Sequence, residues 1–104
     1  MAAADSAVEA RLAEHGLTVP EVAAPVASYV PARRGGSFVF TAGQLPLRDG
    51  KLPAAGRVSD SGEPGTVDPA TAQELAQQAA LNTLAAVKSA IGNLDRVVRV
   101  VKAT

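Results

Sequence analysis

The segment from Asp68 to Asn93 constrains the fold of this chain more than any other, because it predicts one long helix with defined ends. Asp68 is a favourable N-cap, Pro69 suits the first helical position, and Gly92-Asn93 supplies a left-handed stop. The helix is therefore expected to run to Ile91. Its apolar residues form an arc wide enough to lie on a sheet: Leu75, Ala79, Ala86 and Ala90 on one face, with Leu84, Val87 and Ile91 beside it.

Three other segments have the composition of strands. Residues 37–42 (Ser-Phe-Val-Phe-Thr-Ala) form the clearest one, and residues 26–33 form a second that Pro31 places at an edge or a bulge. The turn at 34–36 joins the two into a hairpin. Residues 97–102 (Val-Val-Arg-Val-Val-Lys) predict a third strand, with Val98 and Val100 on one face.

The remaining segments read as a short helix, a linker and a loop. Residues 6–16 predict a helix capped by Asp5 or Ser6 and closed by Gly16, and residues 17–25 an extended linker. Residues 47–68 are rich in glycine and proline and predict a loop, with a tight turn at 48–51 and a brief strand at 51–53 or 56–58.

Length and composition predict one domain with a thin core. The chain has 104 residues, and 47% are hydrophobic, but only two Phe and one Tyr are aromatic. Alanine and valine bury little area each, so we expect neighbouring subunits to complete the core. We therefore expect an oligomer.

Charge and cysteine content exclude several classes of function. Ten basic and ten acidic residues cancel without any Lys/Arg stripe, which argues against nucleic acid as a partner. No apolar stretch could span a bilayer and no signal-peptide pattern is present, so we expect a cytoplasmic protein without a membrane partner. The absence of cysteine rules out thiolate nucleophiles and cysteine-bound metals.

Four features in this order resemble the RidA (YjgF-type) family of reactive-intermediate deaminases. They are Tyr29, the Phe-Val-Phe-Thr-Ala-Gly-Gln-Leu-Pro block at 38–46, the Ala-Leu-Asn-Thr-Leu run at 80–84, and the strand pattern at 95–102. The resemblance covers residues 25–104, a partial RidA-like domain, and residues 1–24 look like an N-terminal helix and linker extension. Family members continue with a second helix and two strands, where an arginine grips the substrate carboxylate. The chain therefore reads as C-terminally truncated.

The resemblance implies a fold, an assembly and an activity. The fold class is α+β, a chorismate-mutase-like two-layer sheet with a helix packed on one face, incomplete at the C-terminus. The assembly is a homotrimer with clefts between subunits. The activity is hydrolysis of enamine or imine intermediates, such as 2-aminoacrylate, to a 2-keto acid and ammonia, without metal or cofactor. The ligand would be a small carboxylate-bearing imine or keto acid, and we expect activity to be impaired without the arginine.

The resemblance also nominates residues for the site. Tyr29, Ala42 and Gly43 match substrate-binding positions; Ala42 stands where many relatives have serine, and Gly43 keeps the backbone open. No catalytic residue is identified, because no acid/base pair or nucleophile pattern occurs. We expect Asn82 to be a buried amide tying helix to loop. The only histidine, His15, is expected to be solvated, and Arg99 is the one arginine kept as a carboxylate-binding candidate.

Two alternatives stay open beside the deaminase. The first is a non-catalytic trimeric module of the same fold that binds a small ligand or a protein, which Ala42 in place of serine favours. The second is a ribonuclease, as older names for the family suggest. The zero net charge and the lack of an acid/base pair argue against the ribonuclease.

Overall fold

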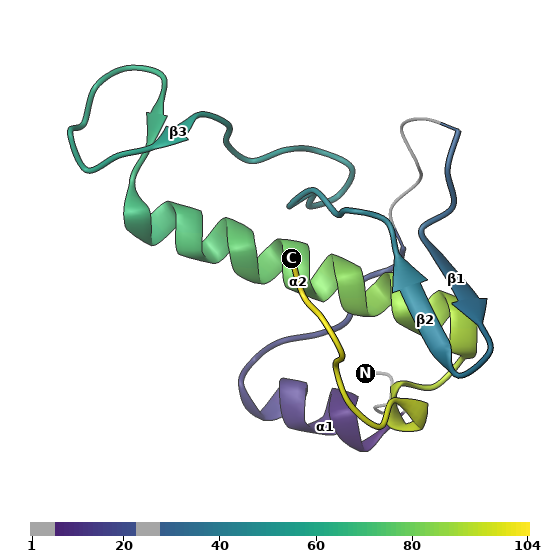
Figure 1. The fold of residues 1–104 in the computed structure, drawn as a ribbon. Coiled ribbons are helices and arrows are strands. Elements are labelled where there is room, and N and C mark those ends of the chain that lie inside the picture. The colour runs from purple at the N-terminus through teal and green to yellow at the C-terminus, as the bar shows by residue number, and fades with distance from the viewer. Residues whose placement is uncertain (1–5, 23–27) are drawn as a thin grey trace.

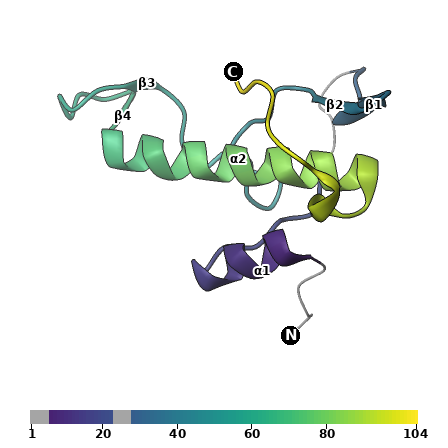
Figure 2. The same ribbon diagram turned by 60° about the horizontal axis from the view of Figure 1, so that its bottom comes forward.

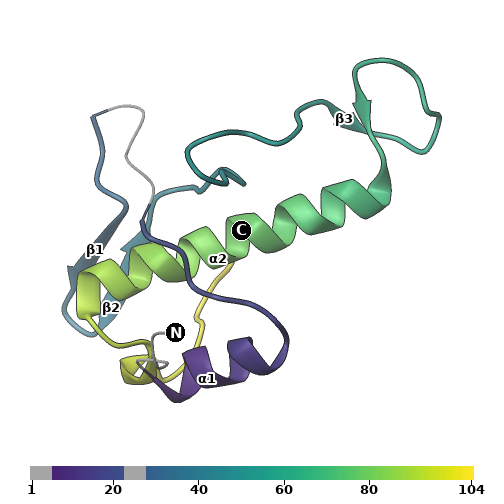
Figure 3. The same ribbon diagram turned by 180° about the vertical axis from the view of Figure 1, so that it is seen from behind.

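The computed structural model describes residues 6–22 and 28–104. One long helix lies at the centre, with a short helix on one side and the strands on the other (Figure 1). The elements are α1 (Ala7–Glu14), β1 (Ala32–Gly35), β2 (Phe38–Thr41), β3 (Arg57–Val58), β4 (Thr66–Val67), α2 (Pro69–Ile91) and a single 3₁₀ turn, η1 (Leu94–Arg96). Figure 2 shows α1 on one side of α2 and the strands on the other. Figure 3 shows the segment that leaves α1 crossing α2 towards the hairpin.

Helix α2 has the ends that the sequence predicts. The Asp68 carboxylate accepts a hydrogen bond from the Thr71 N–H at 3.2 Å, and Pro69 opens the first turn. Gly92 ends the helix with a φ of 85°, and its N–H donates to the Lys88 carbonyl at 2.7 Å. These local signals fix the 23 residues of the helix.

Helix α1 is short and rests on polar contacts. Ser6 is its N-cap and accepts from the Glu9 N–H at 3.1 Å; the alternative cap, Asp5, lies outside the described residues. The Asp95 carboxylate accepts from the N–H groups of Ala7 and Val8 at 2.8 and 3.0 Å, and Glu9 pairs with Lys88 at 3.1 Å. No residue of α1 is buried, so these contacts hold the helix against η1 and α2.

Strands β1 and β2 form the predicted hairpin, but the first strand lies further along the chain than expected. Ala32 pairs with Thr41 and Gly35 with Phe38, so Gly36 and Ser37 form the turn, where Gly36 has a φ of 58°. Of the strand expected at 26–33, residues 32–33 belong to β1, residues 28–31 precede it outside the strand, and residues 26–27 lie outside the described part. A two-residue turn sets the register, and it draws residues 34 and 35 into the ladder.

The segment 97–102, expected to be a strand, is not one. It continues from η1 without any strand partner, and Val98 is 92% exposed. A strand requires a neighbour to accept and donate its backbone hydrogen bonds, and the described residues place none beside it. The expectation rested on composition alone, which does not supply the partner.

The long loop contains the predicted tight turn and only minimal pairing. Arg48 and Lys51 exchange both backbone hydrogen bonds, at 2.8 and 3.1 Å. The brief strand expected at 51–53 or at 56–58 is present at the second place as β3, which pairs in parallel with β4 over two residues.

The core is thin, as the composition predicts. Among the described residues its buried apolar side chains are Val67, Leu81, Ala85, Ala86 and Leu94. Exposed large apolar residues outnumber them and include both phenylalanines and the valines that follow η1. Neither described helix is long and apolar enough to cross a membrane.

Candidate functional site

The three predicted site residues lie at the open end of the β1–β2 hairpin. Beyond the last strand pair, the Ala42 N–H donates to the Pro31 carbonyl at 2.9 Å, which holds the segment after β2 against the segment before β1. Tyr29 precedes Pro31 by two residues and Gly43 follows Ala42, so both sit on these adjoining segments. The structure therefore brings the three positions to one end of the hairpin.

This end of the hairpin leaves polar groups free. Tyr29 is 40% exposed, and a methyl group added at Gly43 would meet no atom within 4 Å. Neither the Tyr29 hydroxyl nor the Gly43 N–H has a hydrogen-bond partner among residues 6–22 and 28–104. The Ala42 carbonyl, by contrast, accepts from the Gln44 side-chain amide at 3.4 Å. A ligand reaching Gly43 would meet a free main-chain N–H, but no hydroxyl at position 42.

Asn82 anchors the segment that leaves this site, which confirms its predicted role. Its side chain is 3% exposed, and its Nδ2 donates to the carbonyls of Leu45 and Leu47 at 2.9 and 3.0 Å. Gln78 Nε2 donates to Asn82 Oδ1 at 3.0 Å, so every polar atom of the amide is paired. The helix thus fixes the backbone on both sides of Pro46, three residues after Gly43.

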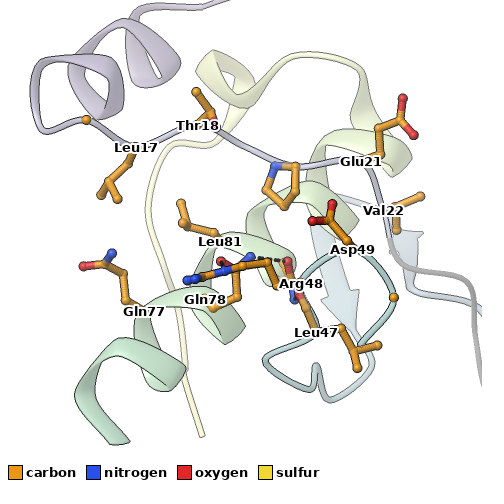
Figure 4. A pocket seen from close by; sticks show the side chains of 14 residues that line it. Leu17, Thr18, Glu21, Val22, Leu47, Arg48, Asp49, Gln77, Gln78 and Leu81 are labelled. Carbon is orange, nitrogen blue, oxygen red and sulfur yellow. Dashed lines mark hydrogen bonds between the residues drawn. The ribbon is translucent and has the colours of Figure 1, made fainter. Parts of the chain in front are cut away.

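A groove that the sequence did not predict lies where three distant segments meet (Figure 4). It has a volume of about 940 Å³, and its walls are segment 16–22, turn 47–50 and one face of α2. Its lining residues are Gly16, Leu17, Thr18, Pro20, Glu21, Val22, Leu47, Arg48, Asp49, Gly50, Gln77, Gln78, Leu81 and Asn82. None of Tyr29, Ala42 and Gly43 belongs to it. The only local signal for it was the charged turn at Arg48-Asp49.

The other residues weighed in the sequence lie away from both places. His15 is exposed at the C-cap of α1, in line with its expected solvated role. Arg99 is exposed in the unpaired segment after η1 and not on a central strand, so the geometry that recommended it is absent. In the part of the chain that the structure describes, no three metal-ligating side chains come together.

Comparison with known proteins decides the family. Residues 9–104 match the family model described as "YjgF/chorismate mutase-like, putative endoribonuclease". The chain belongs to the YjgF/chorismate mutase-like family. The RidA-type resemblance and the α+β chorismate-mutase-like fold class are thereby confirmed. The match begins inside α1, and a division of this YjgF-family chain between residues 24 and 25 stays a prediction.

Three known proteins are similar to this chain over most of its length. Protein TCP17 of Trypanosoma cruzi is 33% identical over 95% of the chain. A solved structure described as a "putative endoribonuclease" from Shewanella oneidensis is 35% identical over 85% of the chain, with a TM-score of 0.73. A protein of unknown function from Agrobacterium tumefaciens is 39% identical over 82%, with a TM-score of 0.66. The chain spans 59%, 55% and 48% of the lengths of these relatives, respectively.

Proposed function

We propose that this protein acts in the hydrolysis of reactive enamine and imine intermediates of the 2-aminoacrylate type, giving a 2-keto acid and ammonia. Membership of the YjgF family supports the proposal, as do the Tyr29, Ala42 and Gly43 positions that the RidA resemblance nominates. The observation that carries it is the open end of the hairpin, where the Gly43 N–H and the Tyr29 hydroxyl are free to meet a ligand.

The proposed hydrolysis requires little catalytic assistance from the protein. The enamine first gains a proton at carbon and becomes an iminium, whose carbon is already electrophilic. Water adds to that carbon, the C–N bond of the resulting carbinolamine breaks, and ammonia leaves while the carbonyl forms. Positioning of the water and the substrate supplies much of the rate enhancement in such a step. In the proposal, the Gly43 N–H donates to the substrate and the Tyr29 hydroxyl orients the water.

The proposed site needs two further parts, a neighbouring subunit and a carboxylate-binding arginine. A homotrimer would place the open hairpin end of one subunit in a cleft beside its neighbour. The resemblance assigns carboxylate binding to an arginine that lies, in the family, after the segment matched by these 104 residues.

A non-catalytic binding module is the second candidate, and Ala42 is the observation that favours it. Alanine offers no hydroxyl to a substrate or a water, and the described residues near Gly43 include no titratable pair that could exchange protons. Such a module would keep a site for small keto acids without turning over an imine.

Ammonia release from enzymatically generated 2-aminoacrylate tests the proposal. Release above the spontaneous rate is expected, with a decrease in Tyr29→Phe and in Gly43→Val, which blocks approach to the backbone. Light scattering on the same samples reports the assembly. A folded oligomer that binds pyruvate without releasing ammonia would contradict the deaminase and leave the binding module.

A further inference from the structure

Two opposite charges face the groove of Figure 4 without neutralising each other. Arg48 and Asp49 are adjacent residues of the tight turn, both line the groove, and no ion pair joins them. The turn holds them by its backbone: Asp49 and Gly50 have φ values of 54° and 76°, the pattern of a type I′ turn. A guanidinium and a carboxylate therefore reach the same groove from neighbouring positions of one turn.

The guanidinium of Arg48 is oriented in advance. Its Nε donates to Gln78 Oε1 at 3.3 Å, and Gln78 in turn donates to the buried Asn82. Figure 4 shows the Arg48 side chain lying across α2 towards Gln77 and Gln78. Because only Nε is engaged among the described residues, the two terminal amino groups of Arg48 remain available for a carboxylate.

The other residues that line the groove indicate which further chemical groups a ligand should carry. Asp49 points towards segment 17–22 in Figure 4, and it accepts no hydrogen bond from a described side chain. Leu17, Leu47 and Leu81 add apolar surface. One arginine against the carboxylates of Asp49 and Glu21 disfavours a polyanion, since both acids would repel it. A zwitterion with a short apolar side chain complements all three features.

We propose that this groove is a binding site for a small apolar α-amino acid, with its carboxylate on Arg48 and its ammonium group on Asp49. The site is separate from the hairpin end that carries Tyr29, Ala42 and Gly43, and it does not depend on the deaminase activity. Gln78 acts as a positioning residue, because it accepts a hydrogen bond from Arg48, and Asn82 holds Gln78 in turn.

An NMR titration with L-valine tests the site. Shifts are expected in the backbone amides of Asp49, Gly50, Gln77 and Gln78. Arg48→Gln removes the carboxylate partner and should weaken binding about tenfold or more, as expected for the loss of a charged hydrogen-bonded pair. Asp49→Asn should weaken it similarly, and asparagine tolerates the positive φ of this position. Arg34→Gln, at an exposed β1 arginine outside the groove, is the matched control.

Two compounds that each carry one charged group of valine test the roles of Arg48 and Asp49 separately. Isovalerate carries only the carboxylate, so its binding should depend on Arg48 and not on Asp49; isobutylamine should show the reverse dependence. Three results would overturn the site: valine shifts that cluster at Ala42 and Gly43, equal affinity in Arg48→Gln and Arg34→Gln, or no shift at saturating valine. Failure of the deaminase is read separately, from the ammonia assay, and leaves these outcomes unchanged.

Discussion

Asn82 satisfies two loop carbonyls from the middle of α2, and its substitution should be among the most damaging in the chain. Asn82→Asp keeps the shape but replaces both Nδ2 donors with an acceptor, leaving the carbonyls of Leu45 and Leu47 unpaired. We expect the free energy of unfolding to fall by about 2–3 kcal/mol. Urea unfolding measures it, and Gln77→Glu, the same chemical change at an exposed neighbour, is the control. Equal losses in the two variants would contradict a stabilising role for these two hydrogen bonds.

Gly56 shows a different constraint, which comes from a neighbouring backbone. It has a φ of 150°, and a methyl group at this position would collide with the carbonyl oxygen of Gly65. Gly56→Ala should therefore cost about 1–3 kcal/mol, because the obstacle is backbone and cannot rotate away. Gly43→Ala, where no atom is near, should change stability by less than about 0.5 kcal/mol. Thermal unfolding of both variants compares them; equal melting temperatures would refute the close approach.

Residue-level roles were predictable where they depend on nearby residues. The sequence indicates that Asn82 is a buried amide, because a polar residue interrupts an apolar helix face. It does not reveal that Gly56 touches Gly65, because that contact depends on the path of a loop. The groove around Arg48 was missed for the same reason, since its walls come from three distant segments.

A helix or strand could be predicted from the sequence when residues close to it in the chain determine it, and not when distant residues do. Helix α2 begins and ends where Asp68, Pro69 and Gly92 place it, since capping involves only adjacent turns. The strand register depends on pairing, so β1 lies later than expected. Segment 97–102 has the composition of a strand but no described partner. A strand-like composition shows that a segment could join a sheet, but it does not provide the neighbouring strand.

Helix α1 should depend on Asp95, which accepts hydrogen bonds from its first two N–H groups. An isolated helix of eight residues is unstable in water, so loss of this anchor should melt it. We expect Asp95→Ala to lower far-UV helicity by about the share of α1 and to cost about 1 kcal/mol. Circular dichroism measures this, with Asp60→Ala in the exposed loop as control. Retained helicity in Asp95→Ala would show that Ser6 and the Glu9–Lys88 pair suffice.

Over the residues that the structure describes, the molecule exposes more large apolar side chains than it buries, and this predicts association. The exposed set includes Phe38, Phe40, Val58, Val98, Val100 and Val101. Apolar surface on this scale is normally covered by a partner, and a homotrimer is the assembly we expect.

Light scattering on the wild type and on Val98→Lys tests this expectation. Val98 is almost fully exposed, so lysine there should leave the fold unchanged while lowering the apparent mass of the assembly by opposing apolar contact. A wild-type chain that is monomeric at all concentrations would contradict the prediction, and an equal mass for both proteins would remove Val98 from the interface.

The two hydrogen bonds from Asn82 to the loop also determine when a protease can cut the chain. Arg48 and Lys51, both exposed trypsin targets, lie just beyond the carbonyls that Asn82 holds, in a segment with little regular structure of its own. A protease needs several residues in an extended form, and a tethered turn supplies them only when it opens. Resistance of these two bonds to trypsin therefore measures how often α2 releases the loop.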